Sequence, residues 1–146
     1  MEENYTIRKA EQSDASSVKC LLEELENREF DQGIFDRIYA EYLRTPLTLM
    51  QVAVHGEDEI VGFISCKGQS LLHHEGLVFE IQELIVNASH QGRGVGRQLI
   101  ATLKPEIAQL GAKSLEVTSN KKRKEAHAFY QSVGFLNSHE KFTIYF

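Results

Sequence analysis

The first third of the chain carries apolar residues at helical spacing. After a short extended stretch at Tyr5–Arg8, one apolar set predicts an amphipathic helix for which Ser13 or Asp14 is the N-cap: Val18, Leu21, Leu22 and Leu25. A second helix is predicted from Asp31 to Leu43, and it stops near Pro46 because helical backbone is disfavoured before a proline. Its apolar face consists of Ile34, Phe35, Ile38 and Tyr42.

The middle of the chain changes to strand periodicity. Leu49–Val54 and Ile60–Cys66 flank a polar turn and predict a hairpin, and Leu77–Val86 predicts a longer strand. A helix follows from Gly94 to Leu110, in which Pro105 is expected to cause a kink or to remove one backbone hydrogen bond. The last predicted elements are a strand, a helix and a strand: Lys113–Thr118, Glu125–Val133 and Phe142–Phe146. The order β-α-α-β-β-β-α-β-α-β predicts an α/β or α+β fold, a mixed sheet covered by helices.

Composition narrows the class of protein. The 146 residues suit one domain, residues 1–146, and no apolar run approaches the roughly 18 residues of a membrane span. The net charge of -5 argues against nucleic-acid binding. Cys20 and Cys66 form no CxxC pair and are expected to be reduced core thiols. With a polar N-terminus that is unlike a signal peptide, the chain is expected in the cytoplasm.

The clearest chemical signal is the sequence Gln91-Gly92-Arg93-Gly94-Val95-Gly96, between the long strand and its helix. A helix N-terminus presents unpaired N–H groups to an anion, and glycines let the backbone approach a pyrophosphate. Arg93 and Arg97 add positive charge. The spacing fits neither GxGxxG nor GxxxxGK[ST], so on this hexapeptide alone a glycine-rich loop without a ligand stays open.

Two motifs together resemble the GNAT superfamily of acetyltransferases. Gln91-x-x-Gly94-x-Gly96 is similar to the superfamily's pyrophosphate signature Q/R-x-x-G-x-G/A. Downstream, a second set is similar to its N…A..FY…GF stretch: Asn120, Ala126, Phe129-Tyr130 and Gly134-Phe135. The resemblance implies the GNAT fold, with helices on both faces of a mixed sheet that splays between its fourth and fifth strands, and acetyl-CoA in the gap.

The resemblance also implies which residues hold acetyl-CoA. The pantetheine arm would lie beside Leu84, Ile85 and Val86, and would touch Asn120. The diphosphate would lie on the turn, at Gln91, Gly92, Arg93, Gly94, Val95, Gly96 and Arg97. The basic run Lys121–Lys124 is either a solvated loop or an approach to the ribose 3′-phosphate, for which Lys122 is the chosen residue.

Attack of an amine on a thioester needs a base for the amine and an acid for the leaving thiolate. Alternation along a strand puts Glu80, Gln82, Leu84 and Val86 on one face, and Ile81, Glu83 and Ile85 on the other. The strand position of the frequent GNAT glutamate favours Glu80 as base over Glu83, and a surface glutamate remains the alternative. Tyr130 matches the tyrosine that reaches the CoA sulfur in GNAT enzymes and is the predicted acid. Its helical spacing would also suit a core tyrosine.

A closer resemblance concerns the acceptor. Glu80-Ile81-Gln82-Glu83-Leu84, Leu72-His73-His74 and Ser138-His139-x-x-Phe142-Thr143 are similar to bacterial aminoalkylphosphonate N-acetyltransferases. This implies a small aminophosphonate acceptor and leaves a divalent metal open, although no metal is expected at His73-His74, which lack a third spaced ligand. Arg37, Arg44 and Lys67 are candidate cations for the anionic group. Another amine acceptor (polyamine, aminoglycoside, protein lysine or N-terminus), a non-catalytic CoA-binding module and a homodimer stay open.

Overall fold

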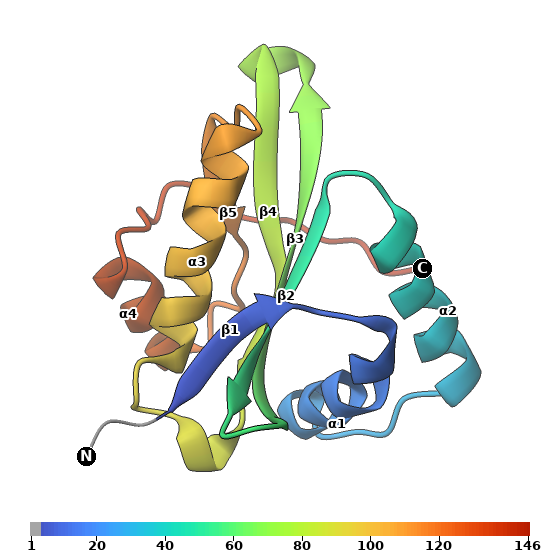
Figure 1. Ribbon diagram of the computed structural model, residues 1–146. Coiled ribbons are helices and arrows are strands. Elements are labelled where there is room, and N and C mark those ends of the chain that lie inside the picture. The colour runs from blue at the N-terminus through green and yellow to red at the C-terminus, as the bar shows by residue number, and fades with distance from the viewer. Residues whose placement is uncertain (1–3) are drawn as a thin grey trace.

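A computed structural model describes residues 4–146, and its centre is one five-stranded sheet with the order β1-β2-β3-β4-β5 (Figure 1). All neighbouring strands are antiparallel except β4 and β5, which are parallel. The strands are β1 Tyr5–Lys9, β2 Thr48–His55, β3 Glu59–Leu71, β4 Gly76–Val86 and β5 Ser114–Val117. The predicted mixed sheet with helices is therefore confirmed.

Helices cover both faces of the sheet, with α1 and α2 on one side and α3 and α4 on the other (Figure 1). Their bounds are α1 Ala15–Glu26, α2 Gln32–Arg44, α3 Val95–Gln109 and α4 Lys124–Ser132. Three single turns complete the elements: η1 Gln12–Asp14, η2 Leu72–His74 and η3 Ala88–His90. No helix within residues 4–146 combines the length and the apolar character that crossing a bilayer requires.

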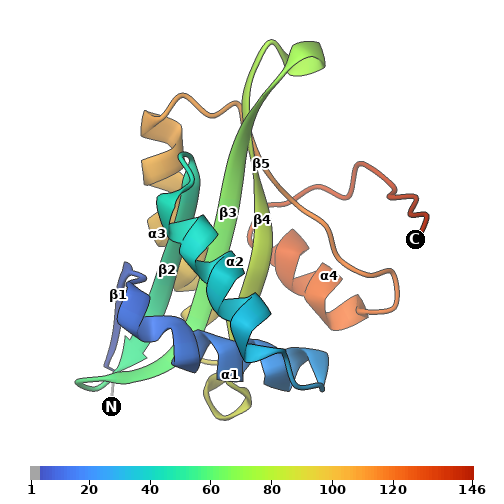
Figure 2. The same ribbon diagram turned by 90° about the vertical axis from the view of Figure 1, so that its right-hand side faces the viewer.

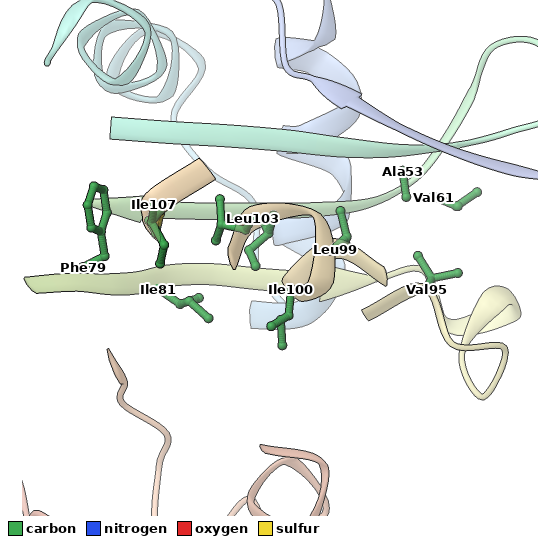
Figure 3. Packing of buried hydrophobic residues seen from close by; sticks show 11 residues of the cluster. Ala53, Val61, Phe79, Ile81, Val95, Leu99, Ile100, Leu103 and Ile107 are labelled. Atoms are coloured by element: carbon green, nitrogen blue, oxygen red, sulfur yellow. The ribbon is translucent and has the colours of Figure 1, made fainter. Parts of the chain in front are cut away.

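The apolar periodicity of the sequence becomes two cores, one on each face of the sheet. Between the sheet and α3, a row of α3 side chains packs on β3 and β4; they include Leu99, Ile100, Leu103 and Ile107 (Figure 3). On the other face, α1 and α2 contribute Val18, Leu21 and Tyr39 against Val52 and Phe63. Alternate residues of β2 face opposite helices, as strand geometry requires: Val52 and Val54 face α1 and α2, and Ala53 faces α3.

Two expectations from the sequence are corrected, those of a last strand and of a buried Cys20, and those on Asp14 and Pro105 are confirmed in part. Residues 142–146 form no strand, and the segment after α4 carries neither helix nor strand (Figure 2). Asp14 is the N-cap of α1, but its carboxylate makes no capping bond, because it accepts from Arg8 and from the backbone N–H of Glu11. Cys66 is buried, which raises its pKa to about 12, whereas Cys20 is exposed. Helix α3 continues through Pro105, which has no N–H and therefore removes one backbone hydrogen bond, as expected.

Candidate functional site

A bulge in β4 decides which carboxylates share a face of the sheet. Ser65 of β3 pairs with Glu83, but the next residue, Cys66, pairs with Ile81, so Gln82 is an extra residue in β4. The alternation shifts at this point: Ile81 packs in the α3 core, and so does Leu84. Glu83, on the other face, reaches Tyr42 of α2.

The predicted separation of Glu80 from Glu83 is therefore wrong. Glu80 pairs in register with Lys67, whose ammonium lies 4.2 Å from the centroid of the Tyr42 ring. Since paired residues on neighbouring strands share a face, Glu80 lies on the α2 face as well. The physical reason is the bulge, which inserts one residue between the two glutamates.

Glu83 is held by its neighbours. The Tyr42 hydroxyl donates to its two carboxylate oxygens at 3.0 and 3.1 Å, and the Ser65 hydroxyl donates to one of them. Burial, and then the charge of Glu83, raise the pKa of Tyr42, so this phenol stays protonated as a donor. The Glu83 carboxylate thus ties α2 to β3 and β4.

Glu80, in contrast, lines an open hollow of about 400 Å³ on the half of β3 and β4 that is nearer to η2. The hollow is lined by Lys67, Gln69, Leu71, Val78, Glu80, Gln82 and Glu116. The Gln82 side-chain amide donates to the Glu80 carboxylate at 3.1 Å, and the Thr118 hydroxyl donates at 3.1 Å. These two donors orient the carboxylate and leave it half-exposed.

Three charged side chains form a row across this hollow. Lys67 of β3 pairs with Glu80 of β4, and Glu80 pairs with Glu116 of β5. Neighbouring strands are about 4.8 Å apart, so the row places one positive and two negative groups at successive short steps. The arrangement matches a small dipolar molecule that has a cationic and an anionic end.

The C-terminal part of β4 has an open edge. Pairing with β5 covers only Val78–Ile81, so Gln82–Val86 have no β5 partner, whereas pairing with β3 continues to Val86. The expected splay between the fourth and fifth strands is confirmed. Backbone groups on this edge are available to an extended ligand that pairs as an added strand would.

The glycine turn follows directly and leads into α3. Gly92 and Gly94 have φ values of +77° and +82°, which favour glycine, and Gly94 is the N-cap of α3. The first bond of the helix runs from Gln98 N–H to Gly94 C=O, so the N–H groups of Val95, Gly96 and Arg97 have no partner within the helix. These amides and the positive end of the helix dipole suit an anion.

The absence of a side chain at Gly96 also lets α4 approach closely. A Cβ at this position would lie 3.2 Å from the Phe129 ring and 3.8 Å from Val86. The end of β4, the start of α3 and α4 therefore meet at one place. Arg97 adds a contact of 3.4 Å to Ser132 of α4.

Several predicted acetyl-CoA residues have side chains that are already engaged. Ile85 and Val95 are buried in the two cores, so each offers only its backbone to a ligand. The Gln91 amide donates to the Val86 carbonyl at 3.1 Å and thereby fixes the turn to the end of β4. The other two predicted residues on β4, Leu84 and Val86, are half-buried beside the open edge.

The basic loop before α4 is exposed. Asn120 accepts from the Lys122 N–H through its side chain and from the Arg123 N–H through its carbonyl, so it shapes the start of α4. Lys122 and Arg93 are both exposed, the first in this loop and the second in the glycine turn.

Tyr130 is half-buried on α4 between Phe129 and Phe135, whose rings lie edge-on to it at 5.4 and 5.7 Å. Burial raises the pKa of Tyr130, and the nearby Arg123 opposes this in part. The phenol is therefore protonated across the physiological range. Within residues 4–146 no hydrogen bond to its hydroxyl is found, in contrast to the hydroxyls of Tyr39 and Tyr42.

His73 and His74 lie in η2, at the tip that joins β3 and β4, with ring centroids 4.2 Å apart. Among residues 4–146, a grouping of three potential metal ligands is found at His55, Glu59 and His90, and it does not include this pair.

Comparison with known proteins identifies the family. Residues 14–135 match the model of the acetyltransferase (GNAT) family. The chain belongs to the GNAT acetyltransferase family. Members of this family are acyltransferases that use acetyl-CoA, and the open edge of β4 with the glycine turn is the part of this fold to which the predicted signature maps.

Individual relatives agree with this family. The chain is 38% identical to an aminoalkylphosphonate N-acetyltransferase of Salmonella typhimurium over 137 residues, which are 94% of this chain and 88% of the relative. An acetyltransferase structure from Trypanosoma brucei is 25% identical with a TM-score of 0.83, covering 98% of this chain and 100% of that one. A Bacillus halodurans structure described as a transcriptional regulator has a TM-score of 0.89 at 23% identity, covering 98% and 100%. The last of these shows the fold alone.

Sequence reasoning missed the bulge at Gln82 and the residues that orient Glu80. One signal was present, because the polar Glu83 interrupts an otherwise apolar set that includes Ile81 and Ile85. Thr118 lies nearly forty residues away in sequence and gave no signal, since its contact with Glu80 depends on the parallel pairing of β4 with β5.

Proposed function

We propose that this protein transfers the acetyl group of acetyl-CoA to the primary amine of a small molecule that carries an anionic group, with aminoalkylphosphonates as the preferred class. The observation that carries the proposal is the row Lys67–Glu80–Glu116 in one hollow. A carboxylate suits the amine and a cation suits the phosphonate. The name of the Salmonella typhimurium relative supports the same class of acceptor.

Acetyl-CoA would bind along the edge of β4 that β5 leaves open, next to the hollow. The unpaired edge at Gln82–Val86 supports a place for the pantetheine arm, and the amides of Val95–Arg97 support a place for the diphosphate. Phe129 of α4 packs against Gly96, so the neighbouring Tyr130 would lie beside the bound arm.

The reaction requires three proton transfers. Glu80 takes a proton from the ammonium form of the acceptor, whose nitrogen then attacks the acetyl carbonyl. A C–N bond forms, the C–S bond breaks, and the Tyr130 hydroxyl gives its proton to the leaving sulfur. The nitrogen loses its second proton to water, from which Tyr130 recovers a proton. The products are an N-acetylated amine and free CoA. Glu80 is preferred to Glu83 as the base because Glu80 lines the hollow, whereas Glu83 is absent from its lining and is bonded to Tyr42 of α2.

Among the three candidate cations, the position of Lys67 supports it over Arg37 and Arg44. Lys67 lines the hollow with Glu80, whereas Arg37 and Arg44 are exposed on α2 and are absent from the residues that line it. Lys67 is also held in place by its contact with the Tyr42 ring, which is worth on the order of 1 kcal/mol. We therefore assign the anionic end of the acceptor to Lys67.

We also propose that the protein acts in the cytoplasm, where acetyl-CoA is available.

An acceptor panel tests the proposal, with free CoA release as the readout. At fixed acetyl-CoA, kcat/KM for 2-aminoethylphosphonate is expected to exceed that for ethanolamine and propylamine by at least about 100-fold, since a neutral analogue leaves the half-buried Lys67 ammonium without its anionic partner. Faster turnover of spermidine or an aminoglycoside than of every aminophosphonate would overturn the acceptor class. No CoA release with any amine, together with acetyl-CoA binding, would favour a CoA-binding module.

A matched set of variants tests Lys67 itself. Lys67→Met keeps the length of the side chain and removes its charge, so it should lower kcat/KM for 2-aminoethylphosphonate about 10- to 100-fold and leave ethanolamine unchanged. Arg37→Met and Arg44→Met are the controls and should change neither. If either arginine variant closes the gap between the two acceptors and Lys67→Met does not, the anionic end lies on α2 instead.

A further inference from the structure

A second cluster of reactive side chains lies away from the hollow and from the glycine turn. His55 ends β2, Glu59 begins β3, and His90 ends η3. The β2–β3 hairpin and η3 both lie at the foot of the sheet (Figure 1), and their three side chains come within 4.8 Å of one another. His55 and Glu59 are register partners across the hairpin. The proposed acetyl transfer uses none of the three.

The distances between the ligand atoms are those of a metal site. His90 Nε2 lies 3.2 Å and His55 Nδ1 lies 3.5 Å from the same oxygen of Glu59. In a tetrahedral zinc site with bonds of about 2.1 Å, neighbouring ligand atoms are about 3.4 Å apart. All three ligand atoms lie within 4.8 Å of one another, and the half-exposed His55 can complete the closure by rotation of its side chain.

The surroundings of His90 strengthen this interpretation. His90 Nδ1 lies 2.7 Å from the Tyr5 hydroxyl, and the two rings meet edge-on. When Nε2 of a neutral histidine binds a metal, Nδ1 carries the proton and needs an acceptor, a role that the Tyr5 oxygen can fill. This second contact fixes the orientation of a ring that is largely buried, with 11% of its side chain exposed.

We propose that His55, Glu59 and His90 form a binding site for a single divalent transition-metal ion of the zinc class. Two imidazoles and one carboxylate favour zinc, cobalt or nickel over calcium and magnesium, which prefer oxygen ligands. Glu59 is 60% exposed, so the fourth position faces solvent and takes water.

The site has a consequence for the glycine turn. His90 directly precedes Gln91 and Gly92, so a metal that joins His90 to the β2–β3 hairpin would fix the start of the turn. The ion would therefore add stability to the fold and order to the turn, without contact with the acceptor hollow. Binding of the ion can be measured without any acetyl transfer, so failure of this proposal and failure of the proposed function are distinguishable.

Isothermal titration of the metal-free, untagged protein with Zn²⁺ at pH 7.5 tests the site. The wild type should bind one ion, and His55→Ala and Glu59→Gln should each weaken binding at least about 10-fold. Both residues lie on the surface hairpin, so these variants avoid the buried His90. The control is His73→Ala combined with His74→Ala, which should leave the affinity unchanged.

Cobalt provides a readout of geometry. Co²⁺ added to the wild type should give the intense visible absorption of a tetrahedral site, and this should be absent in His55→Ala. A wild type that binds no stoichiometric zinc overturns the proposal. So does zinc binding that survives His55→Ala and Glu59→Gln, or that disappears in the His73/His74 control.

Discussion

Two regions of the molecule supply the candidate site, and they differ in how tightly they are packed. The region from β2 to α3 holds fully buried side chains, among them Ile64, Phe79, Leu99 and Leu103, each 0% exposed. From Ser114 to Phe146, no residue is buried. Leu136 and Phe142 in that second region are 88% and 90% exposed. Glu80 and the glycine turn belong to the packed region, whereas Asn120 and Tyr130 belong to the open one.

The difference indicates a division of roles. Burial of apolar surface dominates folding stability, so the packed region determines whether the protein folds. The open region holds only half-buried and exposed side chains, and it joins the rest through the pairing of β5 with β4 and through Phe129, which approaches α3 at Gly96. We expect substitutions of buried side chains in the packed region to change stability, and substitutions of the half-exposed candidate residues Glu80 and Tyr130 to change catalysis.

The largest expected effect is on folding. Phe79→Ala should lower the free energy of unfolding by about 3–5 kcal/mol, because it leaves a cavity in the α3 core. Phe142→Ala, the control from the open region, should change it by less than about 0.5 kcal/mol. Urea denaturation of both variants checks this. An equal loss for Phe142→Ala would show that the C-terminal segment is packed in solution, which contradicts the comparison.

Tyr130→Phe should reverse the pattern, with a large loss of rate and no loss of stability. Removal of the general acid should lower kcat roughly 100- to 1,000-fold, while acetyl-CoA affinity and Tm stay unchanged. Burial raises the pKa of Tyr130 above the usual phenol value of about 10. The part of the wild-type rate that depends on the protonated phenol should therefore persist when the pH is raised past about 10, the usual phenol pKa. Tyr145→Phe is the control, since Tyr145 is 89% exposed in the same region. A normal kcat for Tyr130→Phe would remove the acid role.

Substitutions of the two glutamates of β4 should also differ, with a loss of rate for Glu80 and a loss of stability for Glu83. Glu80→Gln should lower kcat about 100-fold at pH 7, and alkaline buffer should restore part of it because the amine then loses its proton unaided. Glu83→Gln should instead lower the free energy of unfolding by about 1–2 kcal/mol, as the bonds from Tyr42 and Ser65 weaken. Rate profiles against pH and denaturation curves for both variants decide. A rate loss with alkaline rescue in Glu83→Gln alone would make Glu83 the base.

A last effect is expected far from the site, at the start of α1. Asp14→Asn should cost about 1–3 kcal/mol, because the buried Asp14 carboxylate accepts two bonds from Arg8 at 2.8 and 2.9 Å. The Arg8 guanidinium lowers the pKa of Asp14. Its contribution is therefore present above the unfolded pKa of about 3.9 and is lost as the pH falls through the lower folded value. The difference between wild type and Asp14→Asn should shrink in acid, and a constant difference would contradict this assignment.

The sequence predicted the elements and the family because both depend on local patterns. Apolar spacing located α1, α2 and α3, and the positions of Gln91, Gly94 and Gly96 located the turn before α3. The strand predicted at Phe142–Phe146 was wrong: its apolar residues suit a strand, but pairing depends on a partner that spacing cannot reveal.

The acceptor side was harder to predict because it depends on register. A bulge changes the face of every later residue in a strand, so alternation alone placed Glu83 opposite Glu80. The row of Lys67, Glu80 and Glu116 requires the pairing of three strands, one of them parallel, which no local pattern specifies. The functional roles of Glu80, Tyr130 and the turn residues remain predictions for the experiments above.

The placement of acetyl-CoA between the two regions is the central claim, and hydrogen–deuterium exchange with and without acetyl-CoA tests it most directly. The account predicts slower exchange of backbone amides at residues 82–86 and 92–97 when acetyl-CoA is present, together with new protection around Asn120 and Tyr130 as the open region orders. The tip at residues 72–75 should exchange at the same rate in both states. Protection that is absent from residues 92–97, or that appears only at the tip, would contradict the placement.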